Sequence, residues 1–462
     1  MELALLHIMN YSTMHCYLIL TLMVLECYER VSGLDIGRHG NMKKRNAINS
    51  RPNVVVLLAD DVGWGDLGAN GEQDSSSLTD FIPKSVTPIL DKLAKKGLRF
   101  TDFHTGASVC SPSRAALLTS RLGLRTGVVQ NFAVDSAGGL PENETTVAKV
   151  LLDAGYRTAM FGKWHLGLTK GHHPLDHGFQ SYLGVPYSLD MGCTNPPGVN
   201  IPMCPGCEMG YDMYDRGLLQ CVQNIALPLI SNRTIVQQPV KLEKISSAMA
   251  YFAEDFIMNR YGNSDPFFLY GAFSQAHVPL LTEHGSNQKE KVFNETLSEM
   301  DDIVRRILIA VEKSNHMLKK AGLPTQETLI WFLKTNVERI MLHPNSGASG
   351  PNGEIGAVRI GSYKAVFYTG GAASCGGYTP PEDHSRNPLV FNLAVDPAES
   401  EPLSPLSEKY WWFMSKVTNA LSDFYMSLKV DNTSVTDYSV NDMAKPCCSR
   451  ESHVCRCPWD MI

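Results

Sequence analysis

The chain has 462 residues, of which 44% are hydrophobic and 19% are charged, so it has ample material for a folded core in one large domain or two. Its formal net charge of -6 argues against nucleic acid as a partner. No apolar run is long enough to predict a membrane span.

A short apolar block, residues 16–25 (CYLILTLMVL), lies near the N-terminus. Its length and position favour the core of a signal peptide, with the small residues Ser32 and Gly33 near a possible cleavage point. A buried helix is the alternative, and the first fifteen residues carry no Lys or Arg. We expect residues 1–33 to be a signal peptide.

Twelve cysteines fit an oxidising compartment better than the cytosol. Four N-glycosylation sequons support passage through the secretory pathway, and they begin at Asn143, Asn232, Asn294 and Asn432. We therefore expect a glycoprotein with disulfide bonds.

Residues 54–59 (VVVLLA) form a continuous apolar run, which is typical of a strand buried on both faces. Asp60 and Asp61 follow it directly. Active sites of α/β proteins lie beyond the carboxyl ends of such strands, and carboxylate oxygens suit Ca²⁺ or Mg²⁺. Two surface acids in a solvated turn are the alternative, but the position after a buried strand favours a metal site.

Thr87, Pro88 and Gly97 predict the start and the end of a helix, and residues 98–103 are the expected next strand. Residues 110–114 (CSPSR) then predict a loop that runs into a second helix.

Cys110 would lie at the N-terminus of this second helix, where the helix dipole favours negative charge. Arg114, in the first turn, could reach an anion bound there. A small buried cysteine ahead of an ordinary helix is an equally good interpretation of the spacing. A cysteine phosphatase is disfavoured, because three residues between the Cys and the Arg supply too few backbone amides.

Residues 145–154 predict a helix and residues 156–161 a strand, so the order strand, helix, strand indicates a mostly parallel sheet. Lys163 and His165 come just after this strand, where they could hold an anion and move a proton. A surface turn is the alternative for such a short pattern.

Four cysteines fall between residues 192 and 221 in a Gly/Pro-rich segment, namely Cys193, Cys204, Cys207 and Cys221. Four cysteines could bind zinc, but only one Cys-x-x-Cys pair is present. Disulfides are the better interpretation, and the pairing stays open.

Residues 267–273 (FFLYGAF) predict another buried strand, and His277 follows it. This His could be functional or could be a satisfied structural histidine. Residues 295–319 predict a long amphipathic helix, on which Asp301 and Asp302 are expected to be solvated. Residues 328–333 predict the next core strand.

The C-terminal part predicts a small antiparallel unit. Residues 355–368 suggest a hairpin with its turn at Gly361 and Ser362, residues 388–392 a further strand, and residues 411–426 a helix. Four cysteines near the C-terminus indicate a stapled tail, and they are Cys447, Cys448, Cys455 and Cys457.

Several of these motifs together resemble the sulfatase family. Residues 110–114 are similar to its Cys-x-Pro-Ser-Arg signature, residues 60–68 (DDVGWGDLG) resemble its metal motif, and residues 162–165 (GKWH) match its Gly-Lys-Trp-His motif. Residues 186–188 (PYS) resemble a further segment, in which Leu189 replaces the family's His. The resemblance runs from about residue 52 to the tail, with one gap.

The resemblance implies that Cys110 is oxidised to formylglycine, whose hydrated aldehyde attacks the sulfur of a sulfate ester. It implies that Asp60 and Asp61, with the residue at position 110, bind Ca²⁺ or Mg²⁺. Formylglycine and this divalent metal are therefore the expected cofactors.

The resemblance assigns further roles to basic and polar residues. Arg114 and Lys163 would neutralise charge on the reacting sulfate, and His165 would take a proton during catalysis. Lys163, Ser188 and His277 would bind the substrate.

The implied fold is α/β and alkaline-phosphatase-like, with a mostly parallel central sheet flanked by helices and a small C-terminal antiparallel sheet domain. Residues 52–340 would form the N-terminal domain, incomplete at its end, and residues 341–462 the C-terminal domain with its Cys-rich tail. The implied enzyme is a sulfuric ester hydrolase in the lysosome or secreted, acting on aryl sulfates or sulfated glycosaminoglycans such as heparan sulfate. The formylglycine-generating enzyme would be its partner.

The sequence departs from the family pattern after residue 333. A sulfatase should show Asp-Asn-Gly there, but the chain runs Lys334-Thr335-Asn336 and soon reaches Cys375, which has no evident partner. The family's later Gly-Gly-x-Arg-x-Pro segment and second active-site Lys are also missing. An internal deletion explains both observations.

Two other functions compete with an active sulfatase. A catalytically impaired sulfatase-like glycoprotein is favoured by the missing Asp-Asn metal ligands. A metal-dependent phosphodiesterase is disfavoured, because such enzymes keep two full metal sites and a Ser or Thr nucleophile.

Overall fold

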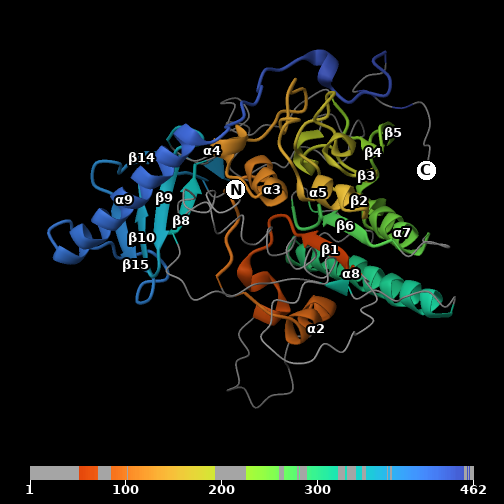
Figure 1. Ribbon diagram of the computed structural model, residues 1–462, viewed down its shortest axis with the longest axis horizontal. Coiled ribbons are helices and arrows are strands. Elements are labelled where there is room, and N and C mark those ends of the chain that lie inside the picture. The colour runs from red at the N-terminus through yellow and green to blue at the C-terminus, as the bar shows by residue number, and fades with distance from the viewer. Residues whose placement is uncertain are drawn as a thin grey trace, which may run out of the picture.

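The computed structural model describes residues 51–70, 85–100, 102–192, 225–259, 265–277, 280, 289–320, 328–329, 340–345, 350–371, 373–374, 377–451, 455 and 457. Within these ranges the chain forms one unit around a seven-stranded sheet and a second around a four-stranded sheet (Figure 1). The expected signal peptide, the cysteines between residues 193 and 221, and Cys375 lie outside the described residues.

The large sheet has the strand order β5-β4-β3-β2-β6-β1-β7. Its strands are β1 (Asn53–Leu58), β2 (Arg157–Gly162), β3 (Ser181–Gly184), β4 (Leu229–Ser231), β5 (Thr234–Gln237), β6 (Phe267–Ala272) and β7 (Thr328–Leu329). Neighbouring strands among β3, β2, β6, β1 and β7 are parallel. Strand β4 pairs antiparallel with β3, and β5 pairs antiparallel with β4. The predicted mostly parallel sheet is confirmed.

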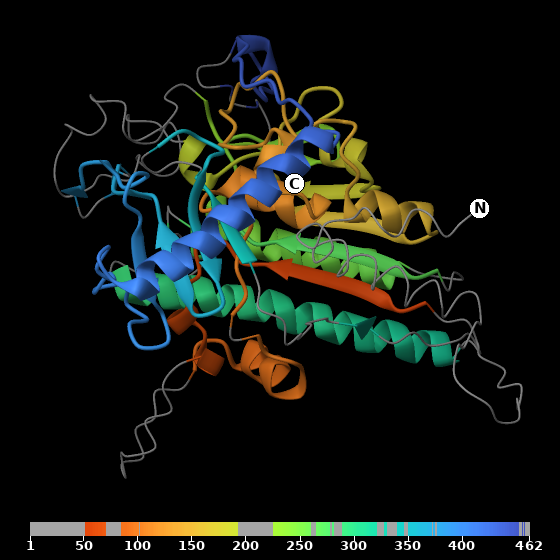
Figure 2. The same cartoon turned by 60° about the vertical axis from the view of Figure 1, so that its left-hand side comes forward.

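Helices cover both faces of this sheet (Figures 1 and 2). They are α3 (Cys110–Thr119) and α5 (Val147–Asp153) on one face, and α7 (Ile245–Met258) and α8 (Lys289–Lys320) on the other. Side chains of β2 and β6 alternate between the two faces. Met160 and Phe268 therefore pack with residues of α3 and α5, whereas Phe161 and Leu269 pack with residues of α7 and α8.

The sequence predicts that Asp301 and Asp302, two adjacent acids of α8, are both solvated, and for Asp301 this prediction is wrong. Asp302 is exposed, but Asp301 is only 3% exposed. Its carboxylate accepts the backbone N–H groups of Ile89 at 3.0 Å and Leu90 at 2.8 Å, in the first turn of α2 (Pro88–Lys96). Because α2 packs on α8, Asp301 caps a helix far away in the sequence, a contact that the spacing of α8 alone could not reveal.

The strand predicted over residues 98–103 is also wrong at the positions that the structure describes. Leu98 and Phe103 are 46% and 70% exposed, so their apolar side chains face no sheet. Arg99 instead donates to the backbone carbonyl of Ala69 in a neighbouring turn. An apolar segment becomes a strand only where a partner strand is available.

The second sheet is antiparallel, with the order β15-β10-β9-β8, and it confirms the predicted C-terminal unit. Its strands are β8 (Ile340–Pro344), β9 (Ile355–Ile360), β10 (Tyr363–Val366) and β15 (Leu389–Asn392). Helix α9 (Glu408–Val430) packs on it through Phe413 and Val417, which share a core with Val358 and Val390. The predicted hairpin with its turn at residues 361–362 is therefore present.

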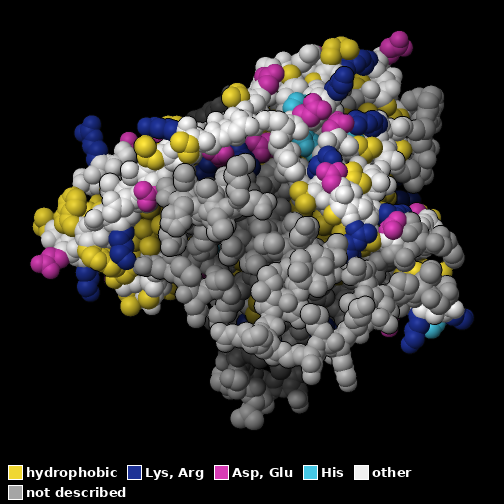
Figure 3. Space-filling model, viewed as in Figure 1, with side chains coloured by type: hydrophobic (Ala, Val, Ile, Leu, Met, Phe, Trp, Pro, Cys, Tyr) yellow, Lys and Arg dark blue, Asp and Glu magenta, His cyan; other side chains and the backbone are white. Residues whose placement is uncertain are grey.

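Six 3-10 turns occur in the described chain: Trp64–Asp66, Gly68–Asn70, Pro174–His177, Leu189–Gly192, Leu242–Lys244 and Asp442–Ala444. Other short elements are also present. They are α4 (Gly123–Thr126), β11 (Tyr368–Thr369) with β14 (Glu382–Asp383), and β12 (Ala373–Ser374) with β13 (Gly377–Tyr378). Two disulfides cross-link the C-terminal tail, one between Cys447 and Cys455 and one between Cys448 and Cys457. Figure 3 shows hydrophobic side chains on the surface around α9. Two exposed hydrophobic residues of this helix are Trp411 and Met426, at 61% and 56% exposure.

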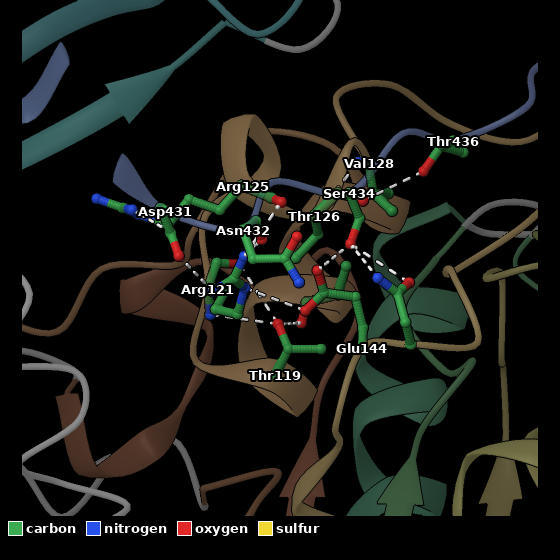
Figure 4. Close-up of polar contacts among 12 residues, drawn as sticks. Thr119, Arg121, Arg125, Thr126, Val128, Glu144, Asp431, Asn432, Ser434 and Thr436 are labelled. Carbon is green, nitrogen blue, oxygen red and sulfur yellow. Dashed lines mark hydrogen bonds and ion pairs between the residues drawn. The ribbon is translucent and has the colours of Figure 1, made fainter. Parts of the chain in front are cut away.

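After α9 the chain returns to the large unit and is fixed there by polar contacts (Figure 4). Asp431 forms ion pairs with Arg121 and Arg125, and Arg121 also pairs with the buried Glu144 at 3.1 Å. The hydroxyl of Ser434 donates to Glu144 at 2.6 Å. This cluster, defined by Arg121, Arg125, Glu144, Asp431 and Ser434, is called the return clamp below.

Candidate active site

Three neighbouring parallel strands bring the predicted site residues to one edge of the large sheet. Asp60 and Asp61 follow β1, Lys163 and His165 follow β2, and His277 follows β6. The carboxyl ends of parallel strands meet at the same edge, which is where α/β enzymes place their active sites.

Each of these three segments contains a residue with left-handed backbone. The φ angles are 56° at Asp61, 58° at His165 and 70° at Ala276, the residue before His277. Such conformations cost free energy in residues other than glycine and concentrate at functional sites. The backbone therefore turns at these residues instead of continuing the strands.

Cys110 is the first residue of α3, next to these strand ends. Its Sγ lies 3.0 Å from Nζ of Lys163. Among the cysteines that the structure describes it is the free one, and it is partly exposed. The predicted nucleophile position thus faces the predicted anion-binding lysine at the start of a helix.

Asp60 is held by two cations. Its carboxylate accepts from Nζ of Lys163 at 2.7 Å and pairs with Nη2 of Arg114 at 3.2 Å. Burial alone would raise the pKa of Asp60, but the charges of Arg114 and Lys163 outweigh burial and hold this pKa well below its usual range. Asp60 therefore stays ionised.

Lys163 is completely buried, and its Nζ contacts three side chains. Besides Asp60 and Cys110, its Nζ donates to Oγ of Ser188 at 3.1 Å. Ser188 in turn lies 3.1 Å from Nε2 of His277, and that nitrogen lies 3.5 Å from Oδ2 of Asp61. All three predicted substrate-binding residues are thus linked to the predicted metal ligands.

Arg114 and His165 complete the site. Nη1 of Arg114 donates to the backbone carbonyl of Lys163 at 2.6 Å, which aligns the guanidinium with the site. Nε2 of His165 lies 3.1 Å from the carbonyl oxygen of Phe132. Both side chains are almost fully buried, at 2% and 1% exposure. Burial lowers the pKa of His165, which favours the neutral ring that a general base requires.

Basic side chains lie around position 110. Burial alone would raise the pKa of the Cys110 thiol, but the neighbouring His165 and His277 and the charge of Lys163 lower it to about 4. Burial would lower the pKa of His277, yet its interaction with Cys110 raises it overall. The arrangement can therefore stabilise an anion at and beside residue 110.

Donor atoms for a divalent cation also gather here. One ligand atom each from Asp60, Cys110 and His277 lies within 4.8 Å of the others, and Asp61 faces His277. The two carboxylates supply hard oxygens of the kind that Ca²⁺ and Mg²⁺ prefer, so this part of the donor set fits such an ion. The neighbouring charges of Arg114 and Lys163 oppose a cation, so further acidic or oxygen ligands would strengthen the site.

All eight predicted site residues are described, and they form one connected cluster. Sequence reasoning missed the residues that support it, above all Ser111, Asn131 and Phe132, which bond to the segments carrying Cys110 and His165. Their contacts run through the backbone, a buried hydroxyl and the side-chain amide of Asn131, for which the sequence has no periodic signal.

Comparisons with known proteins agree with this geometry. The family profile described as Sulfatase matches residues 52–321, and the profile described as the C-terminal region of aryl-sulfatase matches residues 336–457. The sulfatase PsFucS1 from Pseudoalteromonas sp. has the same fold, with a TM-score of 0.61 and 18% identity over 93% of this chain and 96% of its own.

Curated relatives are more similar in sequence. Arylsulfatase G of Rattus norvegicus is 38% identical over 498 positions, which cover 88% of this chain and 93% of the relative, and that of Homo sapiens is 37% identical with the same coverage. Arylsulfatase A of Homo sapiens is 36% identical over 70% of this chain and 58% of its own length. By its profile matches, its relatives and its fold, the chain belongs to the sulfatase family of sulfuric ester hydrolases, among the arylsulfatases.

Proposed function

We propose that this chain hydrolyses sulfate esters with a formylglycine made from Cys110 as its nucleophile. The observation that carries the proposal is the position of Cys110, whose Sγ lies 3.0 Å from the buried Nζ of Lys163 at the start of α3. This sulfur marks the place that the oxygens of the hydrated aldehyde would take. Positive groups on that side would stabilise charge that develops on a reacting sulfate.

The metal part of the proposal rests on Asp60 and Asp61. Together with the residue at position 110, they would hold Ca²⁺ or Mg²⁺. Asp60 lies in the cluster of close donor atoms with Cys110 and His277, and Oδ2 of Asp61 lies 3.5 Å from Nε2 of His277. When bound, such an ion lowers the pKa of a hydroxyl group that it contacts. Asp60 is already ionised, so its carboxylate is ready to bind a cation without losing a proton.

The chain's own residues divide the remaining work. Lys163, Arg114 and His277 surround position 110 with positive charge and would bind the sulfate oxygens. The hydroxyl of Ser188 lies between Lys163 and His277 and orients both. His165, neutral and buried, would accept a proton from residue 110.

We extend the proposal to substrate and location. The resemblance supports a sulfated glycosaminoglycan such as heparan sulfate as the natural substrate, with simple aryl sulfates as accepted analogues. Lysosomal or secreted location fits the two tail disulfides, and the sequon residues Asn143, Asn232, Asn294 and Asn432 are all exposed. The formylglycine-generating enzyme is the partner that the proposal requires.

The alternative of an impaired sulfatase-like protein has no support from the comparisons, because the relatives that match 88% of the chain are arylsulfatases. The positions at which the Asp-Asn ligands were sought, residues 334–339, lie outside the described residues. Loss of sulfatase activity in this chain is thus a possible result of an activity assay and not a second proposal.

Peptide mass spectrometry of the chain secreted from animal cells tests the proposal. We expect the tryptic peptide that contains Cys110 to show the mass loss from thiol to aldehyde, and a hydrazide probe to label it. The Cys110→Ala protein, secreted in parallel, is the control and should not be labelled. Secreted protein that keeps an unmodified thiol at position 110 would refute the formylglycine mechanism.

A further inference from the structure

Ser111, the neighbour of Cys110, is completely buried and bonds to two segments outside its own helix. Its Oγ donates to the backbone carbonyl of His165 at 2.7 Å and accepts the backbone N–H of Phe132 at 3.3 Å. Its own backbone N–H donates to Oδ1 of Asn131 at 2.9 Å. One hydroxyl thus ties the first turn of α3 to the segment that carries His165.

The same Phe132 also fixes the ring of His165. Its carbonyl oxygen lies 3.1 Å from Nε2, and a carbonyl can only accept, so Nε2 carries the hydrogen of the neutral ring. Nδ1 is then the basic nitrogen, and because Nε2 is bonded to Phe132, Nδ1 is the buried nitrogen left for the interaction of His165 with the side chain of Cys110. Nδ1 is therefore the atom left to take a proton from residue 110.

His165 needs such support because its backbone is left-handed, with φ of 58°. A residue of this kind holds that conformation only where surrounding bonds enforce it. The backbone of His165 makes two such hydrogen bonds. Its N–H donates to the carbonyl of Pro186 at 2.9 Å, and its carbonyl accepts from the hydroxyl of Ser111.

We propose that Ser111 is a positioning residue that locks the nucleophile-bearing turn of α3 to the proton acceptor His165. The inference rests on the proposed function for its role in turnover. The hydroxyl fixes where the imidazole sits relative to residue 110, and Phe132 fixes which nitrogen is basic. Without the hydroxyl, the protein would still bind sulfate through Lys163 and His277, but proton transfer would be misaligned.

The test compares Ser111→Ala with Ser111→Thr, which keeps a hydroxyl, and with Ser113→Ala, a partly exposed residue of the same turn. Turnover of an aryl sulfate is divided by the formylglycine content of each protein, because the substitutions lie within the modified motif. We expect Ser111→Ala to lower kcat roughly tenfold or more with KM nearly unchanged and with an altered acidic limb of the pH profile. We expect Ser111→Thr to recover part of kcat and Ser113→Ala to match the original protein.

A second measurement works even without turnover. In protein whose Cys110 is unmodified, the rate of alkylation of this thiol by iodoacetamide reports on the neighbouring imidazole. We expect this rate to fall several-fold in Ser111→Ala and in His165→Gln, with circular dichroism unchanged, but not in Ser113→Ala. Equal alkylation rates and equal kcat in Ser111→Ala and the original protein would overturn the inference. Absence of turnover in the original protein would overturn the proposed function alone.

Discussion

At the residue scale, Ser120 has a strained backbone conformation at the end of α3, the helix that begins with Cys110. It ends α3 in the left-handed conformation, with φ of 57°, while its N–H bonds to the carbonyl of Ala116 at 2.8 Å. The sulfatase resemblance places a glycine here, and glycine adopts this conformation without a steric penalty.

We predict that Ser120→Gly raises the free energy of unfolding by about 0.5 to 1 kcal/mol, because the strain at the end of α3 is relieved. Chemical denaturation measures the change. Ser415→Gly, at an exposed position inside α9, is the matched control and should lower stability by roughly 0.5 kcal/mol. A loss of stability in Ser120→Gly would show that the serine side chain makes a compensating contribution.

Lys163 is the residue whose removal should affect turnover most selectively. We predict that Lys163→Ala lowers kcat/KM by about 10² to 10³, because a buried ammonium that faces residue 110 is lost. Kinetics on an aryl sulfate measure this effect. Lys149→Ala removes a lysine from an exposed ion pair with Asp153, and its kcat/KM should stay unchanged. A loss of less than threefold in Lys163→Ala would exclude a direct role in catalysis.

At the element scale, the packing of α2 on α8 depends on one carboxylate. We predict that Asp301→Ala lowers the free energy of unfolding by about 1 to 2 kcal/mol, because the N–H groups of Ile89 and Leu90 lose their acceptor. Thermal or chemical denaturation checks this value. Asp302→Ala changes the neighbouring exposed acid and should cost less than about 0.5 kcal/mol. Equal effects of both substitutions would contradict the cap.

Two strands of the large sheet that the sequence predicted correctly share one property. Continuous apolar runs predicted β1 and β6, because strands buried on both faces are rich in apolar residues. Residues 98–103 (LRFTDF) mix apolar with polar and charged residues, and the described ones among them form no strand, so the prediction failed there. The short strands β4 and β5 were not predicted, because they depend on pairing with β3 and not on their own pattern.

The residues of the active site also fall into two groups, those that the sequence predicted and those that it did not. Asp60, Cys110, Lys163 and His277 could be found because strand ends and family motifs mark them. The support from Ser111 and Phe132, the cap from Asp301 and the return clamp could not be found. These contacts join residues that are distant in sequence, and no local periodicity encodes them.

At the scale of the whole molecule, the return clamp joins the segment after α9 to the large unit, and it should respond to acid. Burial would raise the pKa of Asp431, but its bonds with Arg125 and Arg121 outweigh burial and lower it. A carboxyl with a lowered folded-state pKa stabilises the fold above the unfolded pKa of about 3.9, and this contribution is lost as the pH falls further.

We therefore predict that Asp431→Asn lowers the midpoint of thermal unfolding at pH 6, and that the difference from the original protein shrinks as the pH falls from about 4 to 3. Differential scanning calorimetry at a series of pH values measures this difference. A difference that stays constant down to pH 3 would mean that the charge of Asp431 does not stabilise the fold.

The relatives contain residues that this chain lacks. The alignment with rat arylsulfatase G spans 498 positions, more than the 462 residues of the whole chain. The sulfatase resemblance implies that the missing part includes an Asp-Asn pair of metal ligands. We nevertheless propose that Asp60, Asp61 and the positive groups around residue 110 suffice for turnover.

Turnover of an aryl sulfate by purified protein of known formylglycine content tests this claim most directly. The account predicts sulfate release that is proportional to formylglycine content, weakened by a chelator and restored by Ca²⁺ or Mg²⁺, and absent in Cys110→Ala. No sulfate release from protein that is folded and fully converted to formylglycine, with either metal in excess, would contradict it.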